Sequence, residues 1–184
     1  MKEQYTLTIY TEDRFDLINK ISLVFSRRNI KIEGITISIC EIENVYKYTI
    51  LITETFETVR NIALQIEKII EVFKCFFHTN EEIIWTQVVL FKMPTSQIMT
   101  NQKLNDLLRK HNAKHLAVES TYTIFEYTFQ EINSFNLMNE LKAFELVEFI
   151  ESSRIAIAKS GEGLHSINKL FSEISQDATG QIRG

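Results

Sequence analysis

The sequence predicts an α+β protein that consists of two tandem ferredoxin-like domains, each with the element order βαββαβ. In some stretches apolar and polar residues alternate, which is typical of half-buried strands. In others the apolar residues recur at three- and four-residue steps, which is typical of amphipathic helices. The order strand, helix, strand, strand, helix, strand is complete within about the first 80 residues and then repeats. Over this length, that order implies two helices on one face of a four-stranded antiparallel sheet.

The first expected domain, residues 1–80, opens with a strand at 5–10. Asp13, with Asp16 three residues later, is expected to cap the helix that follows, because a short polar side chain can bond the free N–H groups of the first turn. The other elements are a helix with its apolar face over 17–25, strands at 30–42 and 45–53 joined by a turn at 43–44, a helix with its apolar face over 59–70, and a strand at 72–77.

The second expected domain, residues 81–160, follows a short linker at 79–81. Its first strand is expected to end at Pro94, since proline cannot donate to a sheet ladder. The other elements are a strand at 82–92, a helix at about 104–108, strands at 114–120 and 121–130, a helix at 135–144 and a strand at 146–158 with a bulge at 151–153. Residues 161–184 are expected to form a C-terminal helix and, from Ser175, a disordered tail.

The composition is that of an ordinary globular protein, with 45% hydrophobic and 24% charged residues in a chain of 184. The net charge of −4 offers no basic surface for a nucleic acid or an anionic membrane, so neither is expected as a partner. No apolar run approaches membrane-spanning length, and the N-terminus lacks the apolar segment of a signal peptide. We therefore expect a cytoplasmic protein in which Cys40 and Cys75 are buried, unpaired thiols.

Glycine is scarce, and Gly34 is the only one in the first 160 residues. A phosphate-binding loop needs glycines that adopt positive φ and allow the backbone to approach the phosphate. The sequence therefore excludes P-loop and dinucleotide-binding folds.

No catalytic or metal-binding constellation is expected. His111 and His115 are four residues apart, a spacing that can hold zinc on a helix, but Asn112 and Ala113 mark the end of that helix. The chain also lacks a nucleophile elbow and paired carboxylates at a recognisable spacing. Glu81 and Glu82 are interpreted as charges that protect a strand from edge pairing.

One turn is a candidate binding site, namely Thr11 to Leu17 between the first strand and the first helix. The N–H groups at a helix N-terminus can hold a carboxylate or a phosphate. This turn carries Glu12, Asp13 and Asp16, however, whose carboxylates can occupy the same N–H groups as caps. Ligand binding and simple capping therefore both stay open, and Lys31 is expected close enough to neutralise some of the negative charge.

Several segments resemble the small subunit of acetolactate synthase, including its ACT domain. The sharpest match is VFSRRNIKIEGITI at 24–37. The resemblance continues through YKYTILI at 46–52, IEKIIEVFKC at 66–75, LFKMPTS at 90–96, LLRKHNAKHLAVESTYTIFEYT at 107–128 and RIAIAKSGEG at 154–163. It covers most of the chain, about residues 5 to 163, and the segments KMPTS and RKHNA resemble the bacterial form.

The resemblance implies a non-catalytic regulatory protein that binds and activates a separate catalytic subunit in branched-chain amino acid biosynthesis. Thiamine diphosphate, magnesium and FAD would belong to that catalytic partner, and this chain would hold no cofactor. The family's ACT domains pair into a homodimer, and valine or another branched-chain amino acid binds at their interface as an inhibitor.

The resemblance also implies candidate effector-binding residues, which are Asp13, Asp16, Leu17, Lys31 and Ile32. At three of them this chain departs from the family pattern: an asparagine is usual at 13, a glycine at 16 and an asparagine at 31. Asp16 adds a Cβ and a negative charge where backbone should approach the carboxylate of the amino acid. We therefore expect valine feedback to be weak or lost, and an internal pair between Asp13 or Asp16 and Lys31 to be able to fill the site instead.

Two other function classes remain. A free-standing ACT-type amino-acid sensor that acts on another enzyme or on a transcription factor would share the first domain, but would not need the second. An enzyme in its own right would need a pocket with perturbed carboxylates, which the sequence does not indicate.

Overall fold

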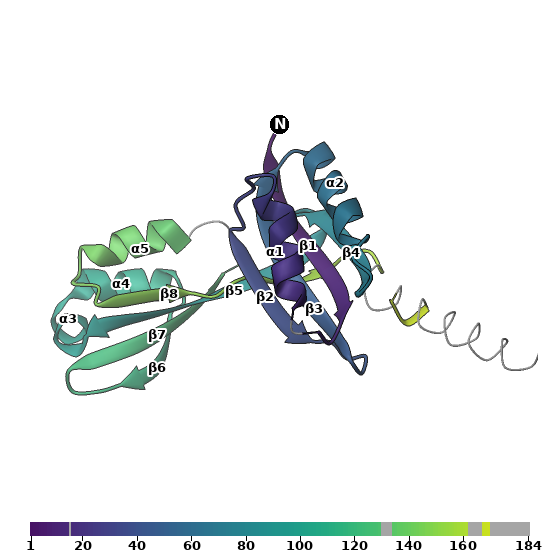
Figure 1. Ribbon diagram of the computed structural model, residues 1–184. Helices are drawn as coiled ribbons and strands as arrows, with labels where there is room; N and C mark the ends of the chain where they lie inside the picture. Colours follow the sequence, from purple (N-terminus) through teal and green to yellow (C-terminus); the bar gives the residue numbers. More distant parts are fainter. Residues whose placement is uncertain (15, 130–133, 162–166, 170–184) are drawn as a thin grey trace, which may run out of the picture. The chain divides into compact units, whose positions relative to one another are not determined.

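The computed structural model describes residues 1–14, 16–129, 134–161 and 167–169 of the chain (Figure 1). By its internal contacts the chain divides into two compact units. Unit 1 consists of Met1–Trp85 and the chain from Arg154, and unit 2 consists of Thr86–Ser153. The domain limits expected from the sequence, 1–80 and 81–160, were set where the order of elements repeats. The two units are defined by contacts instead, so their limits differ from the expected ones.

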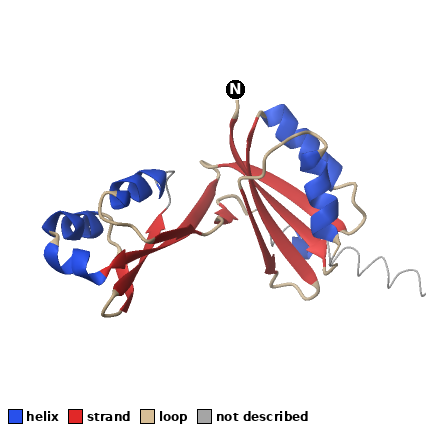
Figure 2. Ribbon diagram, turned by 60° about the vertical axis from the view of Figure 1, so that its left-hand side comes forward, coloured by secondary structure: helices blue, strands red, loops and turns tan. Residues whose placement is uncertain are grey.

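Unit 1 has a four-stranded antiparallel sheet with the strand order β2-β3-β1-β4. Its elements in chain order are β1 (Glu3–Glu12), α1 (Leu17–Ser26), β2 (Gly34–Ile39), β3 (Val45–Glu54), α2 (Phe56–Ile66) and β4 (Val72–Thr79). Both helices cover the same face of the sheet (Figure 2). This arrangement places β2 and β4 at the two edges.

The core of unit 1 lies between the helices and the sheet. Alternate residues of β1, Tyr5, Leu7 and Ile9, point into it and are at most 2% exposed. Leu17, Ile21 and Phe25 of α1 meet them from the helix side, at the four-residue steps that keep them on one face. Burial of these apolar side chains is the main stabilising term for the unit.

Unit 2 repeats the topology in the strand order β6-β7-β5-β8, which confirms the predicted fold class. Its elements are β5 (Ile83–Pro94), α3 (Thr95–Thr100), α4 (Gln102–Lys110), β6 (Lys114–Val118), β7 (Tyr122–Phe129), α5 (Ser134–Lys142) and β8 (Glu148–Glu151). Strand β5 begins in unit 1 and continues into unit 2. Beyond β8, the chain forms β9 (Ile155–Ala158), which pairs with β5.

Some local predictions were wrong. The first helix is capped by Asp16 and not by Asp13, and the Asp16 side chain makes no capping hydrogen bond. The polar stretch after Pro94 forms a helix of its own, α3, with Pro94 at its N-cap position. The strand expected at 146–158 with a bulge at 151–153 is interrupted at residues 152–154, and its two parts, β8 and β9, both pair with β5. A short helix of mostly polar residues, such as α3, shows too few apolar residues at helical spacing to be predicted from the sequence.

The expected C-terminal helix and tail lie largely outside the described residues. Residues 167–169 are helical, and Ile167 packs with Tyr10, Cys40 and Val45 in a small second cluster of unit 1. Both cysteines are buried and unpaired, as expected. Within the described ranges, no helix is long and apolar enough to cross a membrane.

Candidate functional site

In the turn between β1 and α1, backbone N–H groups donate hydrogen bonds to carbonyl oxygens of the same chain. The N–H of Asp13 donates to the carbonyl oxygen of Asn44 at 3.2 Å, and that of Arg14 donates to Glu12 at 3.0 Å. The N–H of Leu17 donates to the carbonyl oxygen of Arg14 at 3.3 Å. These three donors are therefore satisfied within the chain, and a ligand carboxylate would have to displace carbonyl partners to use them.

Asp16 is held by Lys20 and not by Lys31. The Lys20 Nζ lies 3.0 Å from the Asp16 carboxylate, one helical turn away, and 2.6 Å from the Glu71 carboxylate. Hydrogen bonds from Lys20 hold the pKa of both carboxyls below their ordinary values, and the Glu71 and Asp16 carboxylates raise the pKa of Lys20. This network joins the start of α1 to the residue before β4.

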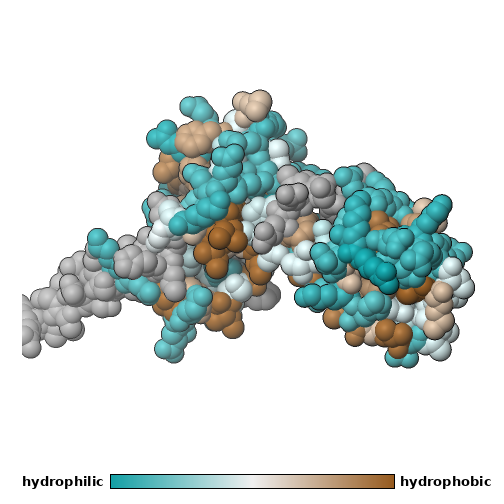
Figure 3. Space-filling model, turned by 180° about the vertical axis from the view of Figure 1, so that it is seen from behind, coloured by the Kyte–Doolittle hydropathy of each residue, from teal (hydrophilic) through white to brown (hydrophobic). Residues whose placement is uncertain are grey.

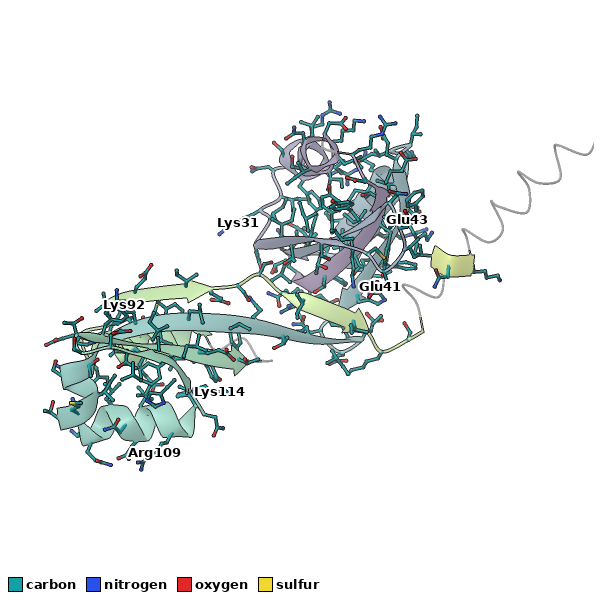
Figure 4. The ribbon with its side chains drawn as sticks, turned by 90° about the horizontal axis from the view of Figure 1, so that it is seen from below. Lys31, Glu41, Glu43, Lys92, Arg109 and Lys114 are labelled. Atoms are coloured by element: carbon teal, nitrogen blue, oxygen red, sulfur yellow. The ribbon has the colours of Figure 1, made fainter. Side chains whose placement is uncertain are left out.

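The other candidate residues have different positions. Lys31 is exposed, points away from the fold (Figure 4) and makes no ion pair with the described residues. Leu17 is completely buried in the core, and Ile32 packs against that core as a half-buried residue. The structure therefore brings Asp13 and Asp16 to one turn but leaves Lys31 outside it.

Tyr48 and Lys20 are neighbours of this turn that the sequence reasoning missed. Tyr48, on β3, is 4% exposed, and burial raises its pKa, with smaller contributions from the negative charges of Asp13 and Asp16. The spacing of four between Asp16 and Lys20 on an amphipathic helix could have indicated the ion pair. Tyr48 could not be found in this way, because it reaches the turn through sheet pairing.

At acid pH the carboxylates of Asp16 and Glu71 become protonated, and their ion pairs with Lys20 should be lost. A carboxyl whose pKa is lowered in the folded state stabilises the fold at neutral pH, and that contribution is lost as the pH falls through the lowered pKa. Lys20 has a raised pKa in the folded state, so its contribution to stability is present at neutral pH and is lost only when the pH rises through that raised pKa. We expect Lys20→Met to be slightly less stable than the wild type in urea unfolding near neutrality, and the difference to shrink as the pH falls through the lowered pKa values of Asp16 and Glu71.

The matched control is Lys110→Met, which removes an exposed lysine at the end of α4 that makes no ion pair with the described residues. A difference between Lys20→Met and wild type that stayed constant from neutral to acid pH would contradict the assignment of this network.

The remaining motifs are structural. The His111 ring lies against Tyr127 and the His115 ring against Phe125, with centroids 5.5 and 4.6 Å apart. No group of three metal-ligating side chains occurs among the residues that the structure describes. The Glu82 carboxylate accepts from the N–H and the hydroxyl of Thr79, at 2.8 and 2.9 Å, so it closes the turn before β5 instead of protecting an edge.

A buried arginine on unit 1 is the most unusual polar group of the described chain. Arg154 is 1% exposed, and its guanidinium carbon lies 3.6 Å from the ring centroid of Trp85. It donates to Thr6 Oγ1 at 3.0 Å, Asn80 Oδ1 at 2.7 Å and Gln4 Oε1 at 3.0 Å, while its Nε has no partner among the residues that the structure describes. Burial lowers its pKa to about 10, so the side chain stays charged at neutral pH.

Arg154 anchors the chain where it re-enters unit 1. Its carbonyl oxygen accepts from Thr36 Oγ1 at 3.2 Å, and two residues later the carbonyl of Ala156 accepts from Lys47 at 3.5 Å. Together with the side-chain bonds, these contacts attach the segment that leads into β9 to β1, β2 and β3.

Comparison with known proteins gives consistent matches. Residues 86–160 match the family model described as the small subunit of acetolactate synthase. The acetolactate synthase small subunit of Bacillus subtilis is 26% identical over 173 residues, which are 94% of this chain and 99% of that protein. The protein of the same name from Mycolicibacterium smegmatis is 20% identical over 87% of this chain and 94% of its own length.

A solved structure has the same fold. The crystal structure of the acetolactate synthase small subunit from Thermotoga maritima matches with a TM-score of 0.74 at 19% identity, and covers 85% of this chain and 98% of its own. The chain is thus similar to acetolactate synthase small subunits along most of its length, and it shares the fold of one of them.

Proposed function

We propose that this chain is the regulatory small subunit of an acetolactate synthase, which binds and activates the catalytic subunit. The observation that carries the proposal is the match to small subunits along almost the full length of both chains. In this proposal thiamine diphosphate, magnesium and FAD are held by the catalytic partner. The complex works in the cytoplasm, in the biosynthesis of branched-chain amino acids.

The regulatory subunit is further proposed to form a homodimer through its ACT domains. Strand β2 supports this, because it is an edge strand of the unit 1 sheet and carries exposed apolar residues. Ile37 is 40% exposed and Ile39 is 75% exposed. An edge strand with exposed apolar side chains is a ready partner for the same strand of a second copy.

Valine feedback is proposed to be weak or lost. Three N–H groups of the β1–α1 turn are satisfied within the chain, and Asp16 places a carboxylate where that of the amino acid would approach. A second carboxylate that approaches Asp16 is repelled by its charge and therefore binds more weakly, although solvent around the exposed Asp16 screens part of this repulsion. Lys20 shields Asp16 in part, but it is shared with Glu71.

Acetolactate formation from pyruvate by the catalytic subunit of the same organism tests these proposals. We expect the chain to increase the rate and valine to leave the increase unchanged. Reversal by valine would keep the regulatory assignment and show that the acidic turn still forms a working pocket. The control variant Asp16→Gly restores the residue usual in the family, and we expect it to gain valine sensitivity.

A failure to increase the rate would favour the alternative, a free-standing ACT-type amino-acid sensor that regulates another enzyme or a transcription factor. Unit 1 alone carries the features that such a sensor needs, so unit 2 distinguishes the two functions. The match of residues 86–160 to the small-subunit family favours the acetolactate synthase assignment.

A further inference from the structure

A groove of about 730 Å³ lies on the helix layer of unit 1, between α1 and the chain that follows α2. Its lining comes from two stretches, residues 20–28 and 65–71. Val24 and Ile69 form part of its floor and pack against the core beneath. The groove is therefore a fixed feature of the fold, held on both sides by core contacts.

Apolar side chains are left exposed in this groove. Leu23 is 45% exposed and Ile70 is 94% exposed, although the residues next to them, Val24 and Ile69, pack against the core. Figure 3 shows that hydrophobic side chains also reach the surface on the opposite side of the chain, so exposure alone does not identify a docking site. The groove differs because its apolar residues lie in a concave surface with charged residues around them.

The charge around the groove is positive and uncompensated. Arg27, Arg28 and Lys68 are exposed and make no ion pair within the described ranges of the chain. The one carboxylate in the lining, Glu71, is already bonded to Lys20. Three free cations on one surface are unexpected in a chain with a net charge of −4. The helix dipoles favour cations after the ends of α1 and α2, but they do not account for the exposed apolar residues between them.

We propose that this groove binds a segment of the catalytic subunit in which an apolar side chain is flanked by carboxylates. The apolar side chain covers Leu23 and Ile70, and the carboxylates pair with Arg27, Arg28 and Lys68. Such a contact has the anatomy of a protein interface, an apolar centre with a charged rim. The inference rests on the proposed function, since it names the surface through which that function acts.

The groove leaves the proposed homodimer contact free. That contact uses the β2 edge of the sheet, whereas the groove is lined by helix residues and by the chain after α2. One small subunit can therefore bind a second copy and a catalytic subunit at the same time, as a regulatory assembly requires.

Charge reversal in the groove tests the proposal. The variant Arg27→Glu/Lys68→Glu should bind the catalytic subunit at least about tenfold more weakly than the wild type in a titration of the two full-length chains. The salt dependence of binding should also become weaker, because screening acts on the charge pairs that the variant removes. Ile70→Asp, at a residue that is almost fully exposed and so leaves folding intact, should weaken binding as well.

The matched control is Arg60→Glu/Arg109→Glu, which changes the net charge by the same amount at exposed positions outside the groove. An equal loss in this control would overturn the proposal, because net charge and not the groove would then govern binding. If the wild type binds and the groove variants bind equally well, the groove is not the binding surface, and the proposed function still stands. Absence of binding by the wild type would overturn both.

Discussion

Replacing Arg154 with alanine should destabilise unit 1 by about 2–5 kcal/mol. The change removes three hydrogen bonds and the stacking on Trp85, and it takes away the Arg154 donor from the oxygens of Thr6 and Asn80, whereas Gln4 Oε1 still accepts from the Asn80 amide. Buried acceptors without a donor carry the full cost of their desolvation, so the loss exceeds that of an ordinary hydrogen bond.

Trp85 makes this prediction easy to measure. It is the only tryptophan of the chain and lies against the Arg154 guanidinium, so its fluorescence follows the state of this site directly. We expect Arg154→Ala to shift the emission and to lower the midpoint of urea unfolding.

The control for Arg154→Ala is Arg109→Ala, an exposed arginine of α4, which should change the stability by no more than about 0.5 kcal/mol. Arg154→Lys keeps the charge but not the planar group, and should lose most of the stacking. If Arg154→Ala unfolded at the same urea concentration as the wild type, the anchoring role would be refuted.

Replacing Phe91 with alanine should destabilise unit 2 by about 3–5 kcal/mol. Phe91 is 1% exposed and stacks on Phe125 with ring centroids 5.2 Å apart, and on Phe149 at 6.4 Å. Three strands thus contribute one aromatic ring each to the centre of the core. The alanine variant leaves a cavity there that the neighbouring strands cannot fill without breaking their pairing.

The adjacent residue is the natural control for this change. Leu90 points to the other face of β5 and is 39% exposed, so Leu90→Ala should cost less than half as much. Hydrogen exchange measured by mass spectrometry should show faster exchange over 86–153 in Phe91→Ala than in Leu90→Ala. Equal exchange in the two variants would contradict the assignment of Phe91 to the core.

Much of the fold could be predicted because apolar periodicity is a local signal. Alternation in β1 and the four-residue steps of α1 each identify an element and the face that it buries. Periodicity is weaker where an element is short, as in α3, or where a strand is interrupted, as at residues 152–154 between β8 and β9. These were the places where the predicted elements differed from the structure.

The candidate site could be predicted only in part, for the same reason. Asp13 and Asp16 are neighbours in sequence and lie in one turn, but the cation that pairs with Asp16 is Lys20 and not Lys31, the partner that the sequence left open. The second partner of Lys20, Glu71, is 51 residues away along the chain. Pairing of this kind depends on how α1 and the chain after α2 pack together.

By itself the sequence determined the fold class, the two βαββαβ repeats and the absence of a glycine-rich phosphate loop, because each depends on residue types at short spacings. Only the tertiary structure decided that Arg154 is buried against Trp85 and bonded to Thr6, a residue 148 positions earlier. It also decided that Leu23 and Ile70 share one groove with Arg27, Arg28 and Lys68. The physical reason is that burial and charge pairing are properties of neighbours in space, and in this fold those neighbours come from different elements.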